Sequence, residues 1–498
     1  MIITLSIIVP IILIYLLHKS KRSPKNLVPP GPQGLPLIGN LLGIASTSNL
    51  PLYLWRLSKK YGPIMQMKIG NVPMIIISSP KLAKEVMKTQ DLAFCGRSSL
   101  LGQRKMSYNC TDIVFSPYGD QWRELRKITA VHLFSLKKNQ SFRPIREDEV
   151  SCMIARISSF SHASSDRRAV NLSEMAMALG GSLICRIAFS KRLEEMQSFE
   201  NLLHEAQAVL MAFYVSDYFP SLSWVDKLCG SINNLDNIFE KLDSFYQEMI
   251  DEHLDRTRVK NLEEEDDILD ILIKLKEQDS CSIELDSDRI KALLTDIFIA
   301  ATDTSAASTI WTMTALIKAP NVMEKLQSEI RNLVGGKGKI DEDDLAKLPY
   351  LKAVINEAMR LYPPAPLLVP RETIERCSLE GYEIQPKTVV YVNAWAIARD
   401  PEYWENPDAF VPERFLNSNI DIKGQDFGVI PFGSGRRMCP GMCMGLANVE
   451  LTVANLLYSF DWELPLGIRA EDIDTDALPG ITMHKKNPLL LVAKQHVV

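Results

Sequence analysis

The chain has 498 residues, of which 46% are hydrophobic and 23% charged, and a formal net charge of −5. This composition is that of an ordinary globular protein with enough apolar residues for a large core. The small negative charge argues against a global basic field, so we expect no nucleic-acid partner. The nine cysteines are scattered and odd in number, which argues against a dense disulfide framework and favours reduced thiols.

The first element along the chain is an apolar run followed by a basic cluster. Residues 2–17 are almost wholly apolar, at the short end of the length that spans a bilayer. Lysines and an arginine follow in residues 18–25, and positive charge on this side favours a cytosolic location for the rest of the chain. A cleaved signal peptide would need a basic start and a small-residue cleavage site. We expect an uncleaved single-pass membrane anchor over residues 1–18.

A proline-rich stretch comes next, with the sequence VPPGPQGLP over residues 28–36. Proline fixes φ and removes backbone donors, which predicts an extended, stiff segment. We interpret residues 19–40 as a basic and proline-rich linker. Residues 41–498 contain no repeat, low-complexity tract or composition break, and we expect them to form one large catalytic domain.

Helical periodicity dominates the body of the chain. The pattern predicts strands over residues 64–69 and 72–77. The acidic run 263–267 is expected to be a solvated loop or helix start. We therefore predict a mainly α fold with a minor β region. The predicted helices span residues 52–60, 82–90, 145–160, 171–190, 198–213 and 234–256.

The most informative stretch is a glycine-rich loop around a cysteine. Glycines before and after Cys439 permit a tight turn and close approach of a flat ligand. Residues 441–457 have a helical pattern, so Cys439 lies near a helix N-terminus, where a thiolate is favoured. Arg437, two residues earlier, is placed to meet an anionic group of the same ligand. A glycine-rich turn around a buried cysteine is the alternative interpretation.

This loop resembles the haem-binding signature F-x-x-G-x-R-x-C-x-G of the cytochrome P-450 superfamily, through Phe432, Gly435, Arg437, Cys439 and Gly441. The resemblance implies the P-450 fold and a haem b (iron protoporphyrin IX) cofactor whose iron has the Cys439 thiolate as axial ligand. Cys443 lies four residues further on. Zinc would need further ligands that are missing at suitable spacing, so we predict that Cys443 is a packing residue.

A charged pair and a distant arginine agree with this resemblance. Glu357 and Arg360 lie three residues apart on one helical face and can pair, although E-x-x-R by itself is common. Arg414 follows in the sequence Pro-Glu-Arg-Phe. In the family these side chains form a buried triad that braces the core on the haem side, and breaking it would leave a buried charge.

An apolar helix predicted over residues 290–317 contains the sequence AATDTS. Alone, it could be a core helix with ordinary polar residues whose hydroxyls bond back to the helix. Its resemblance to the oxygen-activating helix of the family implies that Asp303 and Thr304 are the catalytic acid–alcohol pair that delivers protons. The family commonly has glycine where this chain has Ala301, which adds a methyl group near the expected oxygen and substrate space.

Trp122 and Arg126 lie four residues apart and match the family's W-x-x-x-R, in which both side chains reach a haem propionate. Such a pair is otherwise often surface packing or a cation–π contact.

By position in relatives, a further set of mainly apolar residues is expected to line the substrate pocket, which predicts a small hydrophobic substrate. Leu368 and its neighbour Val369 could equally be core residues. The predicted lining residues are Met106, Phe298, Ala301, Pro366, Leu367, Leu368 and Ile481.

Across essentially its whole length the chain resembles the plant microsomal class, closest to the seventy-one clan and, within it, the aldoxime-handling eighty-three group. This implies an endoplasmic reticulum membrane protein with a cytosolic catalytic domain. It also implies a role in plant specialised metabolism. Its substrate would be either an aldoxime or a terpenoid, phenolic or alkaloid.

The sequence contains no G-x-G-x-x-G after a strand, so electrons are expected from a partner, an NADPH-dependent flavoprotein reductase. A basic docking face near the cysteine is one interpretation of a set of cations, and ordinary solubilising charge is the other. This set is Arg123, Lys127, Lys137, Lys138 and Arg436.

The resemblance predicts a monooxygenase that inserts one atom of dioxygen into its substrate. The alternatives are a haem-thiolate isomerase or dehydratase, which tends to lose the acid–alcohol pair, and a non-catalytic haem-binding protein.

Overall fold

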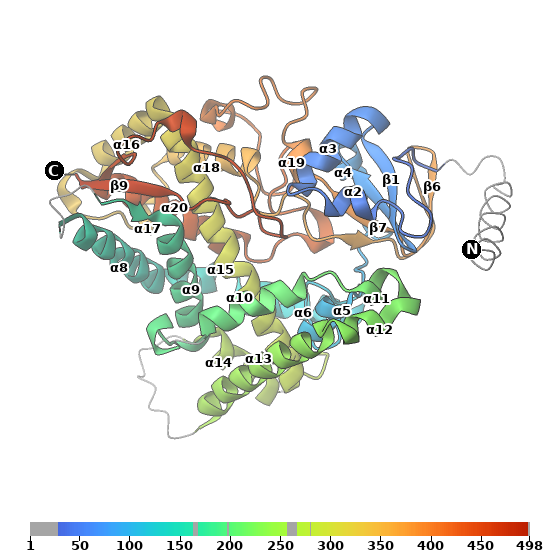
Figure 1. Ribbon diagram of the computed structural model, residues 1–498. Helices are drawn as coiled ribbons and strands as arrows, with labels where there is room; N and C mark the ends of the chain where they lie inside the picture. Colours follow the sequence, from blue (N-terminus) through green and yellow to red (C-terminus); the bar gives the residue numbers. More distant parts are fainter. Residues whose placement is uncertain (1–27, 163–167, 197–198, 256–265, 279, 497–498) are drawn as a thin grey trace, which may run out of the picture.

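The computed structural model describes residues 28–162, 168–196, 199–255, 266–278 and 280–496. The predicted anchor, residues 1–18, and the first part of the predicted linker lie outside these residues. The described chain is mainly helical, with its larger sheet gathered near the N-terminal part of the body (Figure 1). The predicted fold class, mainly α with a minor β region, is therefore confirmed.

Every predicted helical range falls on a helix, although the range 82–90 is divided between an α-helix and a π-helix. Local signals explain individual starts: the Asn49 side chain accepts a hydrogen bond from the Leu52 N–H at 3.1 Å and caps α3. The α-helices are α2 (Leu41–Ala45), α3 (Leu50–Tyr61), α4 (Pro80–Lys84), α5 (Leu101–Met106), α6 (Asp120–Ile128), α7 (Leu136–Ser141), α8 (Arg143–His162), α9 (Leu172–Phe189), α10 (Phe199–Leu210), α11 (Val215–Tyr218), α12 (Ser223–Leu228), α13 (Ser231–Leu254), α14 (Ile268–Glu277), α15 (Ser287–Lys318), α16 (Pro320–Val334), α17 (Glu342–Leu345), α18 (Pro349–Leu361), α19 (Ala394–Ile397) and α20 (Met442–Ser459).

Shorter turns connect these helices. Two are π-helices, η1 (Glu85–Thr89) and η2 (Thr129–Leu133). The others are the 3-10 turns η3 (Leu193–Glu195), η4 (Pro220–Leu222), η5 (Gly335–Lys337), η6 (Pro412–Phe415), η7 (Gly435–Arg437) and η8 (Ala470–Asp472).

Both predicted strands are confirmed and form one edge of a four-stranded sheet with the order β1-β2-β7-β4. Strand β2 pairs antiparallel with β1 and parallel with β7, with Met74 opposite Val389. A three-stranded sheet has the order β3-β9-β8, and β5 pairs with β6. The strands are β1 (Ile64–Ile69), β2 (Val72–Ile77), β3 (Val170–Asn171), β4 (Arg371–Glu372), β5 (Cys377–Leu379), β6 (Tyr382–Ile384), β7 (Val389–Val392), β8 (Phe460–Glu463) and β9 (Leu490–Gln495).

The described part of the proline-rich segment lies along the outer edge of this sheet. The carbonyl of Pro30 accepts a hydrogen bond from the Gln66 N–H at 2.8 Å, and the Asn40 N–H donates to the Lys68 carbonyl at 2.7 Å. A Cβ on Gly31 would meet the Gln66 carbonyl oxygen at 1.9 Å, so only glycine allows this approach. The later part of the predicted linker thus packs on the catalytic body.

Helix α15 runs through the middle of the molecule and crosses α9 (Figure 1). The crossing is close because α9 presents Gly180, where a Cβ would stand 2.6 Å from the carbonyl oxygen of Thr302. The hydroxyls of α15 bond back to carbonyls four residues earlier, as predicted: Thr302 to Phe298 at 2.9 Å and Thr304 to Ala300 at 2.7 Å. Among the described helices, α9 is the only one long and apolar enough to cross a membrane, and 67% of that window is buried.

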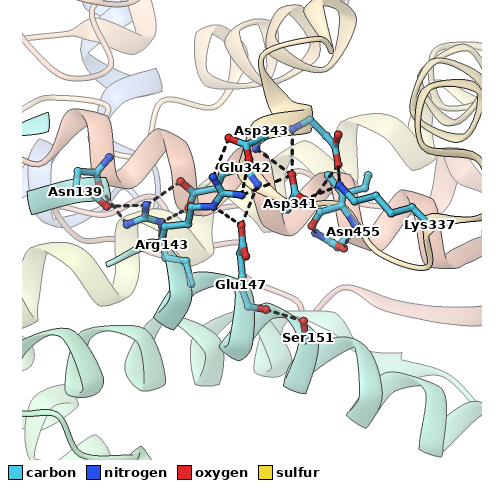
Figure 2. A network of polar contacts seen from close by, with 12 residues as sticks. Asn139, Arg143, Glu147, Ser151, Lys337, Asp341, Glu342, Asp343 and Asn455 are labelled. Atoms are coloured by element: carbon cyan, nitrogen blue, oxygen red, sulfur yellow. Dashed lines mark hydrogen bonds and ion pairs between the residues drawn. The ribbon is translucent and has the colours of Figure 1, made fainter. Parts of the chain in front are cut away.

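A polar network joins α8 to α17 beside α20 (Figure 2). Arg146 is fully buried and donates to both carboxylate oxygens of Glu342, at 2.5 and 2.9 Å. Arg143 makes a bidentate contact with Asp343 at 2.8 and 2.9 Å. On α20, the Asn455 side chain accepts from the Ile340 N–H at 3.1 Å. These contacts hold α8 and the segment around α17 against α20, the helix that follows the cysteine loop.

Only Asp266 and Asp267 of the acidic run 263–267 are described. Asp267 is the N-cap of α14, which confirms the helix start, but its side chain is 2% exposed rather than solvated. The side chains of Ser190, at 2.8 Å, and His253, at 3.2 Å, contact its carboxylate.

Candidate active site

A cavity of about 520 Å³ lies between the middle of α15 and the loop that precedes α20. The cysteine loop contributes Phe432, Arg437 and Cys439 to its wall, and α15 contributes Asp303 and Thr304. The loop and the helix, predicted separately to carry chemistry, therefore face one space.

The cysteine loop depends on a glycine with left-handed backbone. Gly435 has φ 72°, and a Cβ there would stand 2.1 Å from the Met87 carbonyl oxygen. The Cys439 N–H donates to the Phe432 carbonyl at 3.0 Å, which closes the loop. Gly441 is the N-cap of α20, and no atom lies within 4 Å of the position of a Cβ there. The predicted placement of Cys439 beside a helix N-terminus is confirmed.

Opposing influences act on the Cys439 thiol. Burial raises its pKa and is the largest effect, while the hydrogen bond from the Gly441 N–H and the positive charge of Arg126 lower it. The helix N-terminus alone therefore does not suffice to make a thiolate here. A cation bound at the sulfur would supply the missing stabilisation.

Tryptophan and arginine side chains gather beside the cysteine. Trp122 donates its indole N–H to the Ile113 carbonyl at 2.9 Å, and its ring lies 4.5 Å from the guanidinium of Arg437. Arg437 donates to the carbonyls of Cys95 at 2.9 Å and Ser116 at 2.6 Å. Burial lowers the pKa of Arg437 to about 10. These side chains are brought together as predicted.

Arg126 differs from its neighbours because no described residue provides it with a hydrogen bond or an ion pair. It is half-buried and lines the cavity, and burial lowers its pKa while the nearby Cys439 acts in the opposite direction. A half-buried guanidinium facing a cavity is well suited to an anionic ligand group.

Arg97 is a further cavity arginine, and the sequence analysis missed it. Its guanidinium donates to the carbonyls of Val114 at 2.8 Å, Val369 at 3.0 Å and Pro370 at 2.8 Å. Burial lowers its pKa well below the usual value. A lone arginine in the segment Cys-Gly-Arg-Ser carries no local signal, so only the fold reveals its position.

The cysteine loop is also fixed from outside by an ion pair that the sequence did not predict. Arg371 on β4 contacts Asp91 at 2.8 Å and donates to the Ser434 carbonyl at 2.9 Å.

On α15, Asp303 is 6% exposed and its Oδ2 lies 3.1 Å from Nε2 of His484. The other carboxylate oxygen, Oδ1, is buried and has no hydrogen-bond partner among the described residues. Thr304 follows it with its hydroxyl bonded to the helix backbone. The predicted acid–alcohol pair thus lines the cavity together with a histidine that the sequence analysis did not single out.

The predicted triad is assembled between α18, which carries Glu357 and Arg360, and η6, which carries Arg414. Glu357 contacts Arg360 at 2.6 and 2.8 Å and Arg414 at 3.4 Å, and Glu357 and Arg360 are fully buried. Arg360 also donates to the carbonyls of Ala398 and Pro407, each at 2.7 Å. The triad therefore anchors the chain between α18 and η6.

Of the predicted substrate-pocket residues, Met106, Leu368 and Ile481 line the cavity. Phe298 and Ala301 do not. Successive helical residues turn by about 100°, and the cavity side of α15 carries Asp296, Ile299, Ala300, Asp303 and Thr304.

Four predictions of cavity-lining residues are therefore wrong. Phe298 stacks on Phe189 at 5.0 Å, and Ala301 packs against the same core. Leu367 packs against a separate core beside the four-stranded sheet, and Pro366 is likewise absent from the described lining. Cys443 is exposed rather than a packing residue, because α20 turns it away from the core. All nine cysteines lie among the described residues, and none is in a disulfide.

A pair of neighbouring carboxyls, the cavity-lining Asp296 and the fully buried Asp112, was also missed. Asp296 accepts a hydrogen bond from the Ile113 N–H at 2.9 Å, and Asp112 accepts from the Phe115 N–H at 3.0 Å. Burial raises the pKa of both groups, and the neighbouring carboxyl raises that of Asp296 further. The pair ties the segment before α6 to the start of α15.

Comparison with known proteins matches residues 29–492 to the family described as Cytochrome P450. The chain is 48% identical to 6,7,8-trihydroxycoumarin synthase of Pastinaca sativa, over 98% of this chain and 97% of that protein. It is 45% identical to strychnine-11-hydroxylase of Strychnos nux-vomica, over 95% and 93%. It is 45% identical to cytochrome P450 71B37 of Arabidopsis thaliana, over 98% and 97%, which confirms the predicted likeness to the seventy-one clan.

The fold is also shared with a solved structure. A zebra fish cytochrome P450 with progesterone superimposes with a TM-score of 0.76 at 23% identity, covering 90% of this chain and all of the other.

Proposed function

Because the chain belongs to the cytochrome P450 family, it is a haem-dependent monooxygenase, and we propose that the thiolate of Cys439 is the axial ligand of its haem iron. One observation carries this proposal: Cys439 and Thr304 lie on opposing elements, the cysteine loop and α15, that line one cavity. The sulfur that would hold the metal and the hydroxyl that would assist dioxygen thus share the same space.

The residues around the cavity fit a haem. Arg126, without a partner among the described residues, would bind a propionate, and Trp122 and Arg437 lie beside it. The open space at Gly441 leaves room for a flat ring next to the cysteine. The thiol, whose ionisation burial opposes, would be held as a thiolate by the iron.

Bound haem supplies the reductive activation of dioxygen. Insertion of one oxygen atom consumes two electrons and two protons, and the second oxygen atom leaves as water. Asp303 and Thr304 are the cavity residues suited to move those protons, since a carboxyl and a hydroxyl stand next to each other on the cavity wall. The apolar lining around them, such as Met106 and Ile481, would exclude bulk water.

For the substrate we propose a planar phenolic of the coumarin type. The support is the name of the 48% identical relative, which is a synthase of 6,7,8-trihydroxycoumarin. The cavity combines apolar walls with hydroxyl and carboxyl groups at Thr295 and Asp296, which suits an aromatic substrate that carries oxygen substituents. An alkaloid is the second candidate, because another relative is a strychnine-11-hydroxylase. An aldoxime or a terpenoid has no comparable support among these relatives.

We also propose that the body rests on the endoplasmic reticulum membrane and is anchored through residues 1–18. Large apolar side chains are exposed on neighbouring segments: Leu37 is 86% exposed, Trp224 56% and Leu228 77%. The turn after β1 links these segments, because the Gly70 N–H donates to the Ile38 carbonyl at 3.3 Å and the Asn71 N–H donates to the Tyr218 carbonyl at 3.3 Å. Helices α11 and α12 and strand β1 lie on one side of the molecule (Figure 1).

The P450 family depends on a reductase for its electrons, and we propose that here it is an NADPH-dependent flavoprotein. Exposed cations near the cysteine loop would dock it. Arg123 is 59%, Lys127 61% and Arg436 47% exposed at the side chain. Lys138 is engaged with the Asp266 carbonyl at 3.0 Å, which makes it a weaker candidate.

The test uses the full chain with a flavoprotein reductase in lipid vesicles. Reduced protein with carbon monoxide should show the red-shifted Soret band of thiolate ligation, and Cys439→Ala should lack it. Persistence of the band in the variant would refute the assignment of Cys439.

The substrate class is tested separately with panels of hydroxycoumarins, alkaloids and aldoximes. Spectral shifts on binding, followed by product analysis, should favour hydroxycoumarins and require NADPH, reductase and dioxygen together. Turnover without reductase and dioxygen would instead support an isomerase or dehydratase.

A further inference from the structure

The segment between η8 and β9 brings His484 to the wall of the cavity, 181 residues away in sequence from its contact on α15. The imidazole Nε2 lies 3.1 Å from Asp303 Oδ2. The His484 side chain is 28% exposed and that of Asp303 is 9% exposed. The histidine is thus the more exposed member of a contact with a nearly buried carboxylate.

The backbone on both sides of His484 is fixed. The Met483 N–H donates to the Pro364 carbonyl at 2.8 Å, and Trp311 on α15 donates its indole N–H to the Met483 carbonyl at 2.6 Å. The Leu478 N–H donates to the His484 carbonyl at 2.8 Å. The contact with Asp303 is therefore built by the fold and does not depend on a freely moving side chain.

The ring has one charged neighbour among the described residues, Asp303. The adjacent Lys485 turns away, since its Nζ lies 3.0 Å from Asp474 Oδ2 on the same segment. The Oδ2 of Asp303 contacts His484, while Oδ1 is buried and has no hydrogen-bond partner among the described residues. A buried acceptor left unsatisfied is destabilising, and that cost is expected where the oxygen accepts from a transient donor.

We propose that His484 is a positioning residue that holds Asp303 toward the cavity and passes protons to it from solvent; this rests on the proposed monooxygenase function. In the step, the doubly protonated imidazole gives its Nε2 proton to Asp303 Oδ2. The N–H bond breaks with its electron pair left on nitrogen, and an O–H bond forms. Asp303 then gives that proton to the cavity beside Thr304 and returns to the carboxylate, and a hydronium ion from solvent restores the doubly protonated ring and leaves as water. Two such transfers supply the two protons of one turnover.

The alternative is that His484 only fixes the carboxylate as a permanent hydrogen-bond donor. Glutamine separates the two roles, because its amide can donate a hydrogen bond but cannot take up and release a proton. His484→Gln therefore keeps the donor and removes the relay, and His484→Phe removes both. His496→Gln is the matched control, since His496 lies 3.8 Å from Asp461 and is not among the cavity residues.

The main experiment compares two routes to product in the reductase-coupled holoenzyme. With NADPH and dioxygen, His484→Gln should lower product per NADPH on the order of tenfold, raise peroxide release and enlarge the solvent isotope effect. With hydrogen peroxide, which brings its own oxygen and protons, product formation should stay near wild type. His496→Gln should match wild type on both routes.

A second readout is independent of turnover. In the ¹⁵N-histidine spectrum of the carbon monoxide complex, the resonance lost in His484→Gln should show an Nε2–H whose chemical shift reports a hydrogen bond to a carboxylate, and Asp303→Ala should abolish that shift. If His484→Gln fails to load haem, His484→Asn, which also carries an amide donor, takes its place.

Wild-type coupling and isotope effect in His484→Gln would overturn the relay and leave a structural contact. An Nε2–H without the shift of a carboxylate hydrogen bond in the wild type would overturn the contact itself. Absence of product by either route in the wild type would instead refute the monooxygenase function proposed above.

Discussion

Arg371 and Asp91 form a buried ion pair, with Nη1 2.8 Å from Oδ1 and each side chain 4% exposed. Asp91 Oδ2 also accepts the Arg436 N–H at 2.8 Å, and Arg371 Nη2 donates to the Ser434 carbonyl at 2.9 Å. The pair therefore holds the backbone of the cysteine loop at two points on either side of Gly435. The position of the Cys439 sulfur depends on these charges as well as on the glycines of the loop.

Asp91→Asn should destabilise the protein and weaken haem retention. The amide can still accept the Arg436 N–H but leaves Arg371 as a buried charge, which costs about 3–5 kcal/mol. Chemical unfolding and the carbon monoxide spectrum measure both effects. Asp120→Asn is the control, because Asp120 is 88% exposed and a surface pair contributes at most about 1 kcal/mol. Equal losses in the two variants would contradict the role of the buried pair.

Arg126→Leu should release haem faster than wild type. Loss of a charged hydrogen bond to a propionate costs about 1.5–3 kcal/mol, or roughly tenfold to a hundredfold in affinity. Haem transfer to an apomyoglobin acceptor measures the rate. Arg123→Leu is the control, since that exposed side chain pairs with Asp120. An unchanged transfer rate in Arg126→Leu would assign the propionates to Arg97 and Arg437 alone.

Thr304→Ala should uncouple electron consumption from product formation by about tenfold or more, because it removes the hydroxyl next to Asp303. The Thr304 hydroxyl otherwise bonds to the Ala300 carbonyl at 2.7 Å, and serine can make the same bond. Thr304→Ser should therefore retain most of the coupling. Product per NADPH is the measurement, and unchanged coupling in Thr304→Ala would mean that another group delivers the proton.

Gly180→Ala should destabilise the protein although alanine is the better helix former. Its Cβ would meet the Thr302 carbonyl oxygen at 2.6 Å, so α9 and α15 must separate, at a cost of about 1–3 kcal/mol. At the adjacent Gly181 a Cβ would meet only the flexible Leu193 side chain at 3.2 Å. Thermal unfolding should show a loss in Gly180→Ala and little change in Gly181→Ala. Equal behaviour would contradict the close crossing.

Asp217→Asn should stabilise the protein increasingly as the pH rises toward neutral. Burial raises the pKa of Asp217 from 3.8 to about 6. The folded state therefore holds its proton more tightly than the unfolded chain, and wild-type stability falls as the pH rises between these values. The asparagine oxygen can still accept the Leu101 N–H, now 2.8 Å from Asp217 Oδ1. The difference in melting temperature should grow from about pH 4 and level off above about pH 6.5; a constant difference across this range would contradict the raised pKa.

The sequence by itself determined the secondary-structure elements, and it singled out the cysteine loop as a place for chemistry. Glycine at position 435 meets a local backbone requirement, φ 72°, and helical periodicity along the chain is a local property. The pattern around Cys439 and the spacing of Glu357 and Arg360 are likewise readable along the chain, because their partners lie within one turn or loop.

Tertiary structure alone decided which side chains meet across the fold. Asp91 pairs with Arg371, which is 280 residues away, and Asp303 contacts His484, which is 181 residues away. No local sequence pattern encodes such pairs. The tertiary structure also decided which face of α15 borders the cavity. Ala300 lies on that face, and the predicted Ala301 does not. A helix turns about 100° per residue, so an error of one position changes the side of the helix. The physical reason is that a side chain's environment depends on the packing of distant elements, which periodicity does not specify.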